Sequence, residues 1–324
     1  MKIGFTLGKY APFHKGHEFV ISTALAEMDH VIVIIYNASE VTSIPTTVRA
    51  SWIKEIFPEV EVIIAEDGPQ ETGYTKEIIE IQNAYIKKIL DGRKITAFYS
   101  SEAYGQHVSD ALKCANRIVD LNRTKFNISA SMIRNNKVRI KESVSKCVFD
   151  CIKPKIYFLG GPSTGKSTIS SYSADLLGGA YCREYGRDYW FQHQENHRLS
   201  MKDLETIAYE QNRLEETISN EDKELVFIDT TTITTLSYAY YYFGYASDYL
   251  ESLVKANLFK YKHMFLCDED IPFDDTWDRS GHGSREKIQK INKTMLKKYN
   301  ISYTLLSGSV EERFSTVKAY LETI

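Results

Sequence analysis

The first residues whose types and spacing could do chemistry lie in the segment from Gly8 to His17, which reads G-K-Y-A-P-F-H-K-G-H. His14 and His17 stand at the expected start of a helix, where free backbone N–H groups and the helix dipole favour an anion. Gly8 lets the chain turn, and Gly16 lets a phosphate approach the backbone. The segment therefore predicts a triphosphate cradle that stabilises charge on a leaving pyrophosphate. A capped turn is the alternative role for the same histidines.

A second segment of the same half, I-S-A-S-M-I-R at 128–134, also suits a polyphosphate. Ser129 and Ser131 are good N-cap residues, and Arg134 falls about one turn into the helix that they would start. Two hydroxyls, free N–H groups and a guanidinium match phosphate oxygens. Alone, such a segment is an ordinary helix start, so its pairing with the histidine segment carries the prediction.

The segment G-G-P-S-T-G-K-S at 160–167 fits the P-loop pattern G-x-x-x-x-G-K-S/T, after an expected strand and before an expected helix. Backbone N–H groups of such a loop wrap a β-phosphate, while Lys166 bridges phosphates and Ser167 ligates Mg²⁺. The residues expected to bind ATP here are Gly160, Gly161, Pro162, Ser163, Thr164, Gly165, Lys166, Ser167 and Thr168. We therefore predict a nucleotide-binding P-loop.

Two further sets of residues could serve phosphoryl transfer. Asp229 ends the strand-like run L-V-F-I-D and could bind Mg²⁺ or accept the proton of an attacking hydroxyl, although an N-cap is its plainer role. Arg279 and Arg285 lie in a polar loop that could close over ATP, and Arg279 is assigned to the ATP-binding set. Solvated loop arginines are the plainer interpretation of this pair.

A phosphoryl acceptor needs a second pocket, and the segment R-E-Y-G-R at 183–187 follows about one helix after the P-loop. Glu184 and Arg187 could hold ribose hydroxyls, and Tyr185 could stack on a flat ring. A charged helix start explains these residues equally well. The chain has 22 tyrosines, and their cluster from Tyr238 to Tyr245 is expected to pack in the core or in an interface.

Strand-like and helix-like stretches alternate along the chain, which predicts an α/β fold with parallel sheets. Charged residues and Pro154 mark a linker at 135–154, so we expect one domain at 1–150 and a second at 151–324. Strands are expected at 2–8, 31–36, 60–65, 95–100, 117–121, 155–160, 180–182, 225–229, 263–268 and 303–306. Ligands of such sheets bind outside the carboxyl ends of strands, where both predicted phosphate sites lie.

Composition excludes several classes of protein. The 324 residues are 43% hydrophobic and 26% charged, with a formal net charge of −3, so neither a disordered chain nor a basic nucleic-acid binder is expected. No run approaches the ~20 apolar residues that span a bilayer, and no signal peptide is evident. We expect a cytoplasmic protein without membrane insertion. Its 5 cysteines contain no C-x-x-C pair and are expected to be free thiols.

The paired segments G-x-x-x-P-x-H-x-G-H and I-S-x-S-x-x-R resemble those of the Rossmann-like adenylyl- and cytidylyltransferase superfamily. The resemblance implies that a substrate phosphate attacks the α-phosphate of ATP, with Mg²⁺ and release of pyrophosphate. It assigns triphosphate binding to His14, His17, Ser129, Ser131 and Arg134. The ATP-binding set also includes Gly8, Lys9, Tyr10 and Gly16, with Tyr10 where an aromatic residue is common.

Within that superfamily, three further segments resemble nicotinamide-mononucleotide adenylyltransferases. They are Pro45 to Arg49 leading into Trp52, Ser100 to Glu102, and Asp120 to Arg123. Trp52 itself is expected to lie in the core. The second half resembles a ribosylnicotinamide kinase through its P-loop, its E-Y-G-R and F-I-D-T segments, and a loop with Pro272 and Arg279.

Over nearly its whole length the chain therefore resembles the bifunctional NadR-type family. The resemblance implies a Rossmann-like nucleotidyltransferase domain followed by a P-loop kinase domain, and ATP, Mg²⁺, nicotinamide riboside, nicotinamide mononucleotide and NAD as ligands. Enteric members carry an N-terminal helix-turn-helix, whereas here the first strand begins at residue 2, so no repressor function is expected. The family's lid Asp-Gly is replaced by Thr276-Trp277, which leaves open which arginine contacts ATP.

Two alternative functions remain. One is an enzyme with the same phosphate chemistry but other substrates, and the other is a nucleotide sensor. A phosphopantetheine adenylyltransferase fused to a dephospho-coenzyme-A kinase has the same domain order, but the E-Y-G-R and F-I-D-T segments favour nicotinamide substrates. A nucleotide sensor with one inactive site would lack catalytic groups, whereas His14, Arg134, Lys166 and Asp229 are all present. The sequence leaves a homo-oligomer open.

Overall fold

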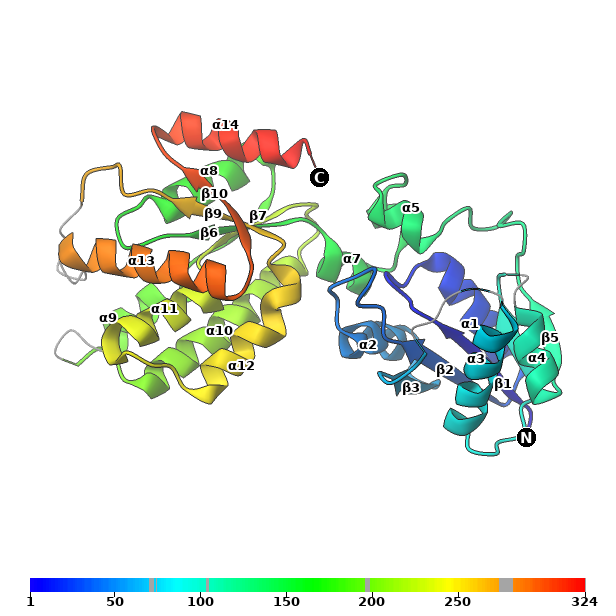
Figure 1. Cartoon of the computed structure of the whole chain (residues 1–324). Coiled ribbons are helices and arrows are strands. Elements are labelled where there is room, and N and C mark those ends of the chain that lie inside the picture. The colour runs from blue at the N-terminus through cyan, green and yellow to red at the C-terminus, as the bar shows by residue number, and fades with distance from the viewer. Residues whose placement is uncertain (70–72, 74, 103–104, 196–198, 274–281, 324) are drawn as a thin grey trace. The chain divides into compact units, whose positions relative to one another are not determined.

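The computed structural model describes every residue except 70–72, 74, 103–104, 196–198, 274–281 and 324. The chain divides into two compact units, Met1–Phe149 and Asp150–Ile324, called here the N-terminal unit and the C-terminal unit (Figure 1). Each unit is built on one 5-stranded sheet whose paired strands are parallel. The predicted α/β class is confirmed.

The N-terminal sheet has the order β3-β2-β1-β4-β5. Its strands are β1 (Ile3–Gly8), β2 (His30–Tyr36), β3 (Glu61–Ala65), β4 (Ala97–Ser100) and β5 (Ala115–Ile118). Its helices are α1 (Lys15–Glu27), α2 (Thr46–Ile56), α3 (Lys76–Ile89), α4 (Gln106–Leu112), α5 (Ala130–Arg134) and α6 (Ile140–Ser143). The last helix of this region, α7 (Lys146–Ile152), contains the boundary between the units.

The order of the strands creates a crevice beside β1. The chain moves outward from β1 to β2 and β3, then returns to β4 on the other side of β1. Because such crossovers are right-handed, α1 and α2 cover one face of the sheet and α3 and α4 cover the other. Connections therefore leave the carboxyl ends of β1 and β4 in opposite directions, which is where ligands bind in open parallel sheets.

The C-terminal sheet has the order β10-β9-β6-β8-β7. Its strands are β6 (Lys155–Leu159), β7 (Ala180–Cys182), β8 (Val226–Asp229), β9 (His263–Cys267) and β10 (Ser302–Leu306). Its helices are α8 (Lys166–Leu177), α9 (Tyr185–His193), α10 (Met201–Ser219), α11 (Thr232–Phe243), α12 (Asp248–Asn257), the short 3-10 helix η2 (Leu258–Lys260), α13 (His282–Lys298) and α14 (Val310–Leu321). Helices α8 and α14 cover one face and α9 to α13 the other (Figure 1).

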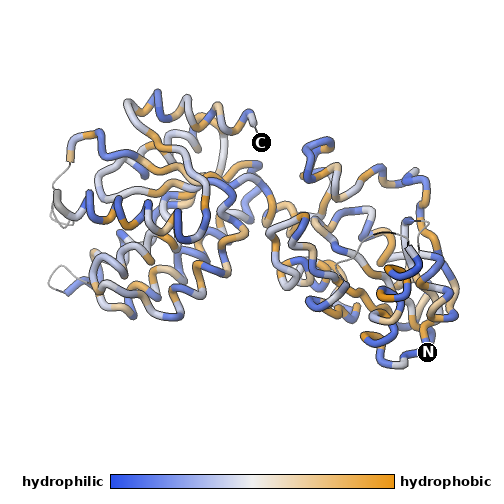
Figure 2. Tube along the Cα trace, in the orientation of Figure 1, coloured by the Kyte–Doolittle hydropathy of each residue, from blue (hydrophilic) through white to orange (hydrophobic). Residues whose placement is uncertain are grey.

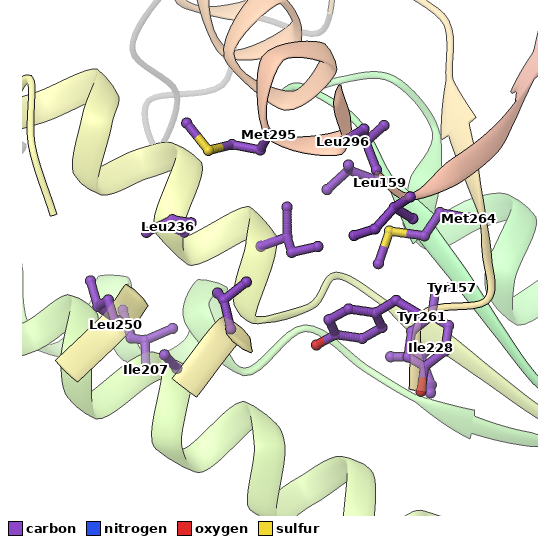
Figure 3. Packing of buried hydrophobic residues seen from close by; sticks show 14 of the residues in the cluster. Tyr157, Leu159, Ile207, Ile228, Leu236, Leu250, Tyr261, Met264, Met295 and Leu296 are labelled. Carbon is purple, nitrogen blue, oxygen red and sulfur yellow. The ribbon is translucent and has the colours of Figure 1, made fainter. Parts of the chain in front are cut away.

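Burial on both faces explains the apolar strands. β2 reads H-V-I-V-I-I-Y with five consecutive buried residues, as expected for a strand covered by helices on both sides. The helices instead alternate between hydrophobic and hydrophilic stretches along the trace (Figure 2). In the C-terminal unit, Tyr157, Leu236, Met264 and Leu296 belong to a core between the sheet and its helices (Figure 3). Among the described residues, no helix is long and apolar enough to cross a membrane.

The largest differences between the predicted and the observed elements fall in three regions. The strand expected at 117–121 ends at Ile118, because Asp120 has φ 53° and turns the chain. Helix α4 had no expected counterpart, since its seven residues are too few to show a clear periodicity. Helix α13 begins at His282, inside the stretch expected to be a polar loop. The buried side of this helix includes the polar residues Arg285, Gln289 and Asn292. A search for regularly spaced hydrophobic residues therefore does not reveal where the helix begins.

Candidate active sites

The connection from β1 to α1 brings the two motif histidines together. His14 is the N-cap residue of α1, and its backbone N–H donates to Nδ1 of His17 at 3.3 Å. The two imidazole rings stack with their centroids 3.6 Å apart. A Cβ at Gly16 would lie only 3.1 Å from the His14 ring, so a glycine keeps this helix start open. Because Nδ1 of a neutral His17 accepts a hydrogen bond, its proton is on Nε2, which can donate to a phosphate oxygen.

Both histidines are neutral in this site at physiological pH. Burial, followed by the positive charge of Arg123, lowers the pKa of His14 from its ordinary 6.5 to about 4. Burial and the two neighbours His14 and Arg123 also lower the pKa of His17 well below its usual value. The Nδ1 atom of His14 is buried and has no hydrogen-bond partner among the described residues. The site is therefore preorganised for an anion, which would compensate Arg123 and the helix start.

Helix α5 adds a guanidinium and two hydroxyls to the same pocket. Ser129 is the N-cap residue of α5, and its hydroxyl accepts a hydrogen bond from the Met132 N–H. The hydroxyls of Ser129 and Ser131 are 2.9 Å apart. The guanidinium of Arg134 donates to the carbonyl of Ala11. Ala11 lies in the segment 8–17 that contains His14 and His17, called here the histidine loop. The two motifs, more than 100 residues apart in the sequence, thus contact each other directly.

Arg49 of α2 connects the histidine loop to the end of β2 through hydrogen bonds. Its side chain is 1% exposed. Nη1 donates to the carbonyls of Lys9 and Tyr36, which follow β1 and end β2, respectively. Nε donates to the Ile44 carbonyl at 3.2 Å and Nη2 to the Thr46 hydroxyl at 2.9 Å. A planar guanidinium can bind all four acceptors at once, which a lysine ammonium cannot do with the same geometry.

These elements enclose a cavity of about 590 Å³ at the carboxyl ends of β1 and β4. It is lined by residues of every N-terminal motif singled out from the sequence except Pro45 to Arg49, namely Gly8, Lys9, Tyr10, His14, Gly16, His17, Ser100, Ser101, Glu102, Asp120, Arg123, Ser129, Ser131 and Arg134. Trp52 is 3% exposed and lies in the core, as expected. A cavity of this size lies within the range of small-molecule sites.

A glycine at the helix start and two side-chain hydrogen bonds shape the P-loop segment of the C-terminal unit. Gly165 stands at the start of α8 with φ 79°, a conformation that favours glycine. The hydroxyl of Thr164 and the Nζ atom of Lys166 each donate to the Gly161 carbonyl at 2.9 Å. Ser167 lies in the first turn of α8, where its hydroxyl and the helix N-terminus flank the loop.

A second buried arginine holds the P-loop. Arg313 of α14 is 3% exposed, and its Nη1 donates to the Thr164 carbonyl at 2.7 Å. Its Nε donates to the Gly308 carbonyl at 3.1 Å, and its Nη2 pairs with the carboxylate of Asp270. From the other side, the Gly161 N–H donates to Oε1 of Gln289 at 3.0 Å. The loop is thus fixed by side chains from α13 and α14.

Two buried polar groups near the P-loop have unused hydrogen-bonding capacity. Asp229 ends β8 with 1% exposure, and its Oδ1 has no partner within the described part of the chain. Arg285 is 2% exposed and donates through Nη1 to the Ile271 carbonyl at 2.9 Å, while its Nε and Nη2 have no partner among the described residues. The carbonyl of Arg285 would lie 2.9 Å from a Cβ at Gly161, so this residue packs directly on the P-loop.

An acceptor pocket of about 120 Å³ opens beside the P-loop. Pro162, Ser163 and Lys166 of the loop form one part of its wall. The rest of the wall comes from Glu184, Gly186, Arg187, Trp190, Leu199, Leu204, Ile207, Gln211, Thr230, Thr234, Thr235, Tyr238 and Tyr242. The pocket therefore combines the phosphate loop, one acidic and one basic side chain, and three aromatic rings.

Comparisons with known proteins give a separate family match in each of the two units. Residues 5–136 match the cytidylyltransferase-like family, and residues 155–313 match an AAA domain family. The trifunctional NAD biosynthesis/regulator proteins NadR of Salmonella typhimurium and Escherichia coli are each 26% identical to this chain over 325 aligned residues, which cover 93% of this chain and 78% of each relative. The chain is homologous to NadR.

Solved NadR structures show the same fold. A crystal structure of a NadR protein in complex with NAD and AMP-PNP superimposes with a TM-score of 0.65 at 18% identity, covering 99% of this chain and 95% of that one. A NadR protein in complex with NR gives a TM-score of 0.64 at 20% identity, with the same coverage of 99% and 95%. The Rossmann-like domain followed by a P-loop domain is confirmed.

In this NadR homologue, only some of the residues predicted for the kinase site line the acceptor pocket. Glu184 and Arg187 line the acceptor pocket and pair with each other at 3.6 Å. Tyr185 is not one of the residues that line it, but packs on the core and on Tyr189, with ring centroids 6.1 Å apart. Arg279 and the Thr276-Trp277 pair lie outside the described residues. Thr168 is exposed on α8.

Sequence reasoning missed the aromatic wall. Trp190 of α9 and two tyrosines of α11, Tyr238 and Tyr242, line the acceptor pocket. The spacing of Thr234, Tyr238 and Tyr242 at every fourth residue after a strand-terminal aspartate could have indicated one helix face directed at the site. The tyrosine cluster was instead expected to be core or interface, because nothing in its composition separates packing from ligand contact.

The buried histidine pair generates a prediction about pH. We expect the His14 imidazole to titrate with a pKa of about 4 in the nucleotide-free chain and with a higher pKa when a triphosphate is bound. Since this value lies below the ordinary 6.5, neutral His14 contributes stability above pH ~6.5 that is lost as pH falls toward ~4. Long-range ¹H–¹⁵N NMR titration measures the ring directly, with the urea-unfolded chain as reference. A folded-state His14 pKa near 6.5 would contradict this electrostatic description.

The two arginine clamps generate a crossed prediction. Replacing either arginine by lysine keeps the charge but loses the fork that binds two carbonyls. Arg49→Lys should raise amide hydrogen exchange about tenfold in residues 8–17 and leave residues 160–167 unchanged, whereas Arg313→Lys should do the reverse. A tenfold change corresponds to roughly 1.4 kcal/mol, close to the lower end of the range for hydrogen bonds to charged groups, which is about 1.5 kcal/mol. Mass spectrometry of peptic peptides measures both loops in one sample. Equal changes in both loops, or none, would show that the arginines do not act as local clamps.

Proposed function

We propose that this chain converts nicotinamide riboside to NAD in two ATP-dependent steps. The C-terminal unit phosphorylates the riboside to nicotinamide mononucleotide, and the N-terminal unit adenylylates the mononucleotide with release of pyrophosphate. Homology to NadR supports both activities. The observation that carries the proposal is the acceptor pocket, because one small cavity contains P-loop Lys166 together with Glu184 and three aromatic rings.

The acceptor pocket suits a cationic ring better than a neutral base. Nicotinamide riboside carries a positively charged pyridinium, which aromatic faces attract through the ring quadrupole. Trp190, Tyr238 and Tyr242 supply such faces, and Glu184 supplies a carboxylate in the same cavity. Arg187 pairs with Glu184 and could bind a ribose hydroxyl. The substrate class assigned to the pocket is therefore a pyridinium riboside.

In the kinase step, the 5′-hydroxyl oxygen of the riboside forms a bond to the γ-phosphorus of ATP. The bond from that phosphorus to the β,γ-bridging oxygen breaks, and its electron pair leaves with ADP. Asp229, whose Oδ1 is buried and unpaired within the described chain, is assigned to receive the hydroxyl proton. Lys166 and Arg285 provide positive charge for the phosphoryl oxygens.

In the adenylylation step, a phosphate oxygen of the mononucleotide attacks the α-phosphorus of a second ATP, and pyrophosphate leaves with the electron pair of the broken bond. The attacking phosphate is already ionised, so catalysis here is positioning and charge stabilisation. His14, His17 and Arg134 are assigned to the triphosphate, with Ser129 and Ser131 at the start of α5. The positive charge of Arg123, which helps to lower the pKa of both histidines, adds a further cation.

Magnesium fits the oxygen donors of the kinase site. The Ser167 hydroxyl and the Asp229 carboxylate are hard oxygen ligands of the kind that Mg²⁺ prefers, and one carboxylate oxygen of Asp229 is buried without a partner in the described structure. These two residues would hold the ion. When bound, it would neutralise charge on the β- and γ-phosphates.

Crossed substitutions test the proposed division of labour. His14→Ala should lower adenylylation of nicotinamide mononucleotide at least ~100-fold, because phosphate-stabilising groups contribute on this order. The same variant should leave riboside phosphorylation within about twofold. Lys166→Ala should give the opposite pattern. Each activity is measured with its own substrate and MgATP, and each variant serves as the folding control for the other. Loss of both activities in both variants would contradict two independent sites.

A further inference from the structure

Thr230 makes the turn from β8 to α11 in a conformation that is unfavourable for its residue type. Its φ is 69°, in the left-handed region that β-branched residues rarely adopt. Glycine would make the same turn without a steric penalty, and asparagine with a smaller one. Residues strained in this way cluster at functional sites, so the Thr230 side chain is a candidate for a direct role.

The neighbouring hydrogen bonds fix this turn on both sides. The Thr230 N–H donates to the Phe158 carbonyl at 3.3 Å and so continues the pairing of β8 with β6. The next residue, Thr231, is the N-cap of α11, and its hydroxyl accepts a hydrogen bond from the Ile233 N–H at 3.2 Å. Its own N–H donates to the Thr234 hydroxyl at 3.3 Å. One residue therefore has to complete the change from strand to helix.

The turn places Thr230 at the acceptor pocket. In a continuing strand, successive side chains would point to opposite faces of the sheet. Here the residue directly after Asp229 lines the acceptor pocket, in a wall that also contains Lys166 and Thr234. Thr230 is 3% exposed, and the adjacent Asp229 is 1% exposed with an unpaired Oδ1 among the described residues. The Asp229 carboxylate and the Thr230 hydroxyl thus lie on consecutive residues at the carboxyl end of β8.

We propose that the Thr230 hydroxyl is a substrate-positioning group of the kinase, which hydrogen-bonds the riboside and holds its attacking hydroxyl beside Asp229. A threonine hydroxyl both donates and accepts, so it can bind a sugar hydroxyl that itself donates its proton to the carboxylate. Thr230 forms no covalent bond and keeps its proton. The inference rests on the kinase function proposed above and adds a specific contact to it.

Three substitutions separate the hydroxyl from the shape and from the backbone. Thr230→Ser keeps the hydroxyl, Thr230→Val keeps the branched shape without it, and Thr230→Gly keeps the turn without any side chain. We expect the kcat/KM for nicotinamide riboside to stay within about threefold in the serine variant and to fall at least ~tenfold in the other two. The KM for ATP and the adenylylation of nicotinamide mononucleotide should not change. Thr230→Gly should unfold at no lower temperature than Thr230→Val, because glycine adopts this conformation freely.

Several results would overturn the inference. They are a valine variant with wild-type kcat/KM for the riboside, a serine variant as weak as the valine variant, and a parallel rise in the KM for ATP, which would indicate a P-loop defect. Wild-type chain is first assayed with pyridinium, purine and pyrimidine ribosides, and the variants are compared on whichever is phosphorylated. Turnover of another riboside alone would reject the proposed substrate while still testing Thr230. A wild type that phosphorylates none of the panel would contradict both proposals.

Discussion

Both candidate phosphate sites are built on backbone loops that a buried guanidinium group holds in place. A polyphosphate is bound mainly by N–H groups and cations, and these are effective only if they do not have to reorganise when the nucleotide arrives. Arg49 binds the Lys9 carbonyl of the histidine loop and the Tyr36 carbonyl at the end of β2. Arg313 binds the P-loop carbonyl of Thr164 together with the turn before α14. Each arginine binds carbonyls by hydrogen bonds and so restrains the backbone that carries the N–H groups of the loop. The two sheets differ in strand order, yet a buried arginine holds the candidate phosphate loop in both units.

The two sites differ in how they use charge. The N-terminal site contains neutral histidines, because burial and Arg123 disfavour their protonation. Its attacking group is a phosphate that needs no base, so donors and cations suffice. The C-terminal site has a buried carboxylate, Asp229, and in the proposed kinase step it is assigned to the proton that the attacking hydroxyl must lose. The chemistry of the acceptor, more than that of ATP, thus accounts for the different residues at the ends of β1 and β8.

The sequence predicted the phosphate motifs and the α/β class, because both depend on local patterns. A P-loop is one continuous segment between a strand and a helix, and the histidine and serine motifs each begin a helix. The acceptor pocket could not be predicted as well. Trp190 and Tyr238 come from different helices and look like core residues, and Tyr185 packs away from the pocket although its motif suggested a ligand contact. Arg313 lies about 150 residues from the P-loop carbonyl that it binds, a contact that no spacing rule indicates. The strained turn at Thr230 is a property of the backbone that residue types do not reveal.

In the proposed function, one chain contains two working sites in series. Product analysis by mass spectrometry tests this most directly, with MgATP and nicotinamide riboside, nicotinamide mononucleotide, phosphopantetheine or dephospho-coenzyme A supplied separately. We expect NAD from both nicotinamide substrates and no reaction of the coenzyme-A precursors. Turnover of only the coenzyme-A precursors would contradict the assigned substrates, and mononucleotide accumulating without NAD would contradict a functional first site.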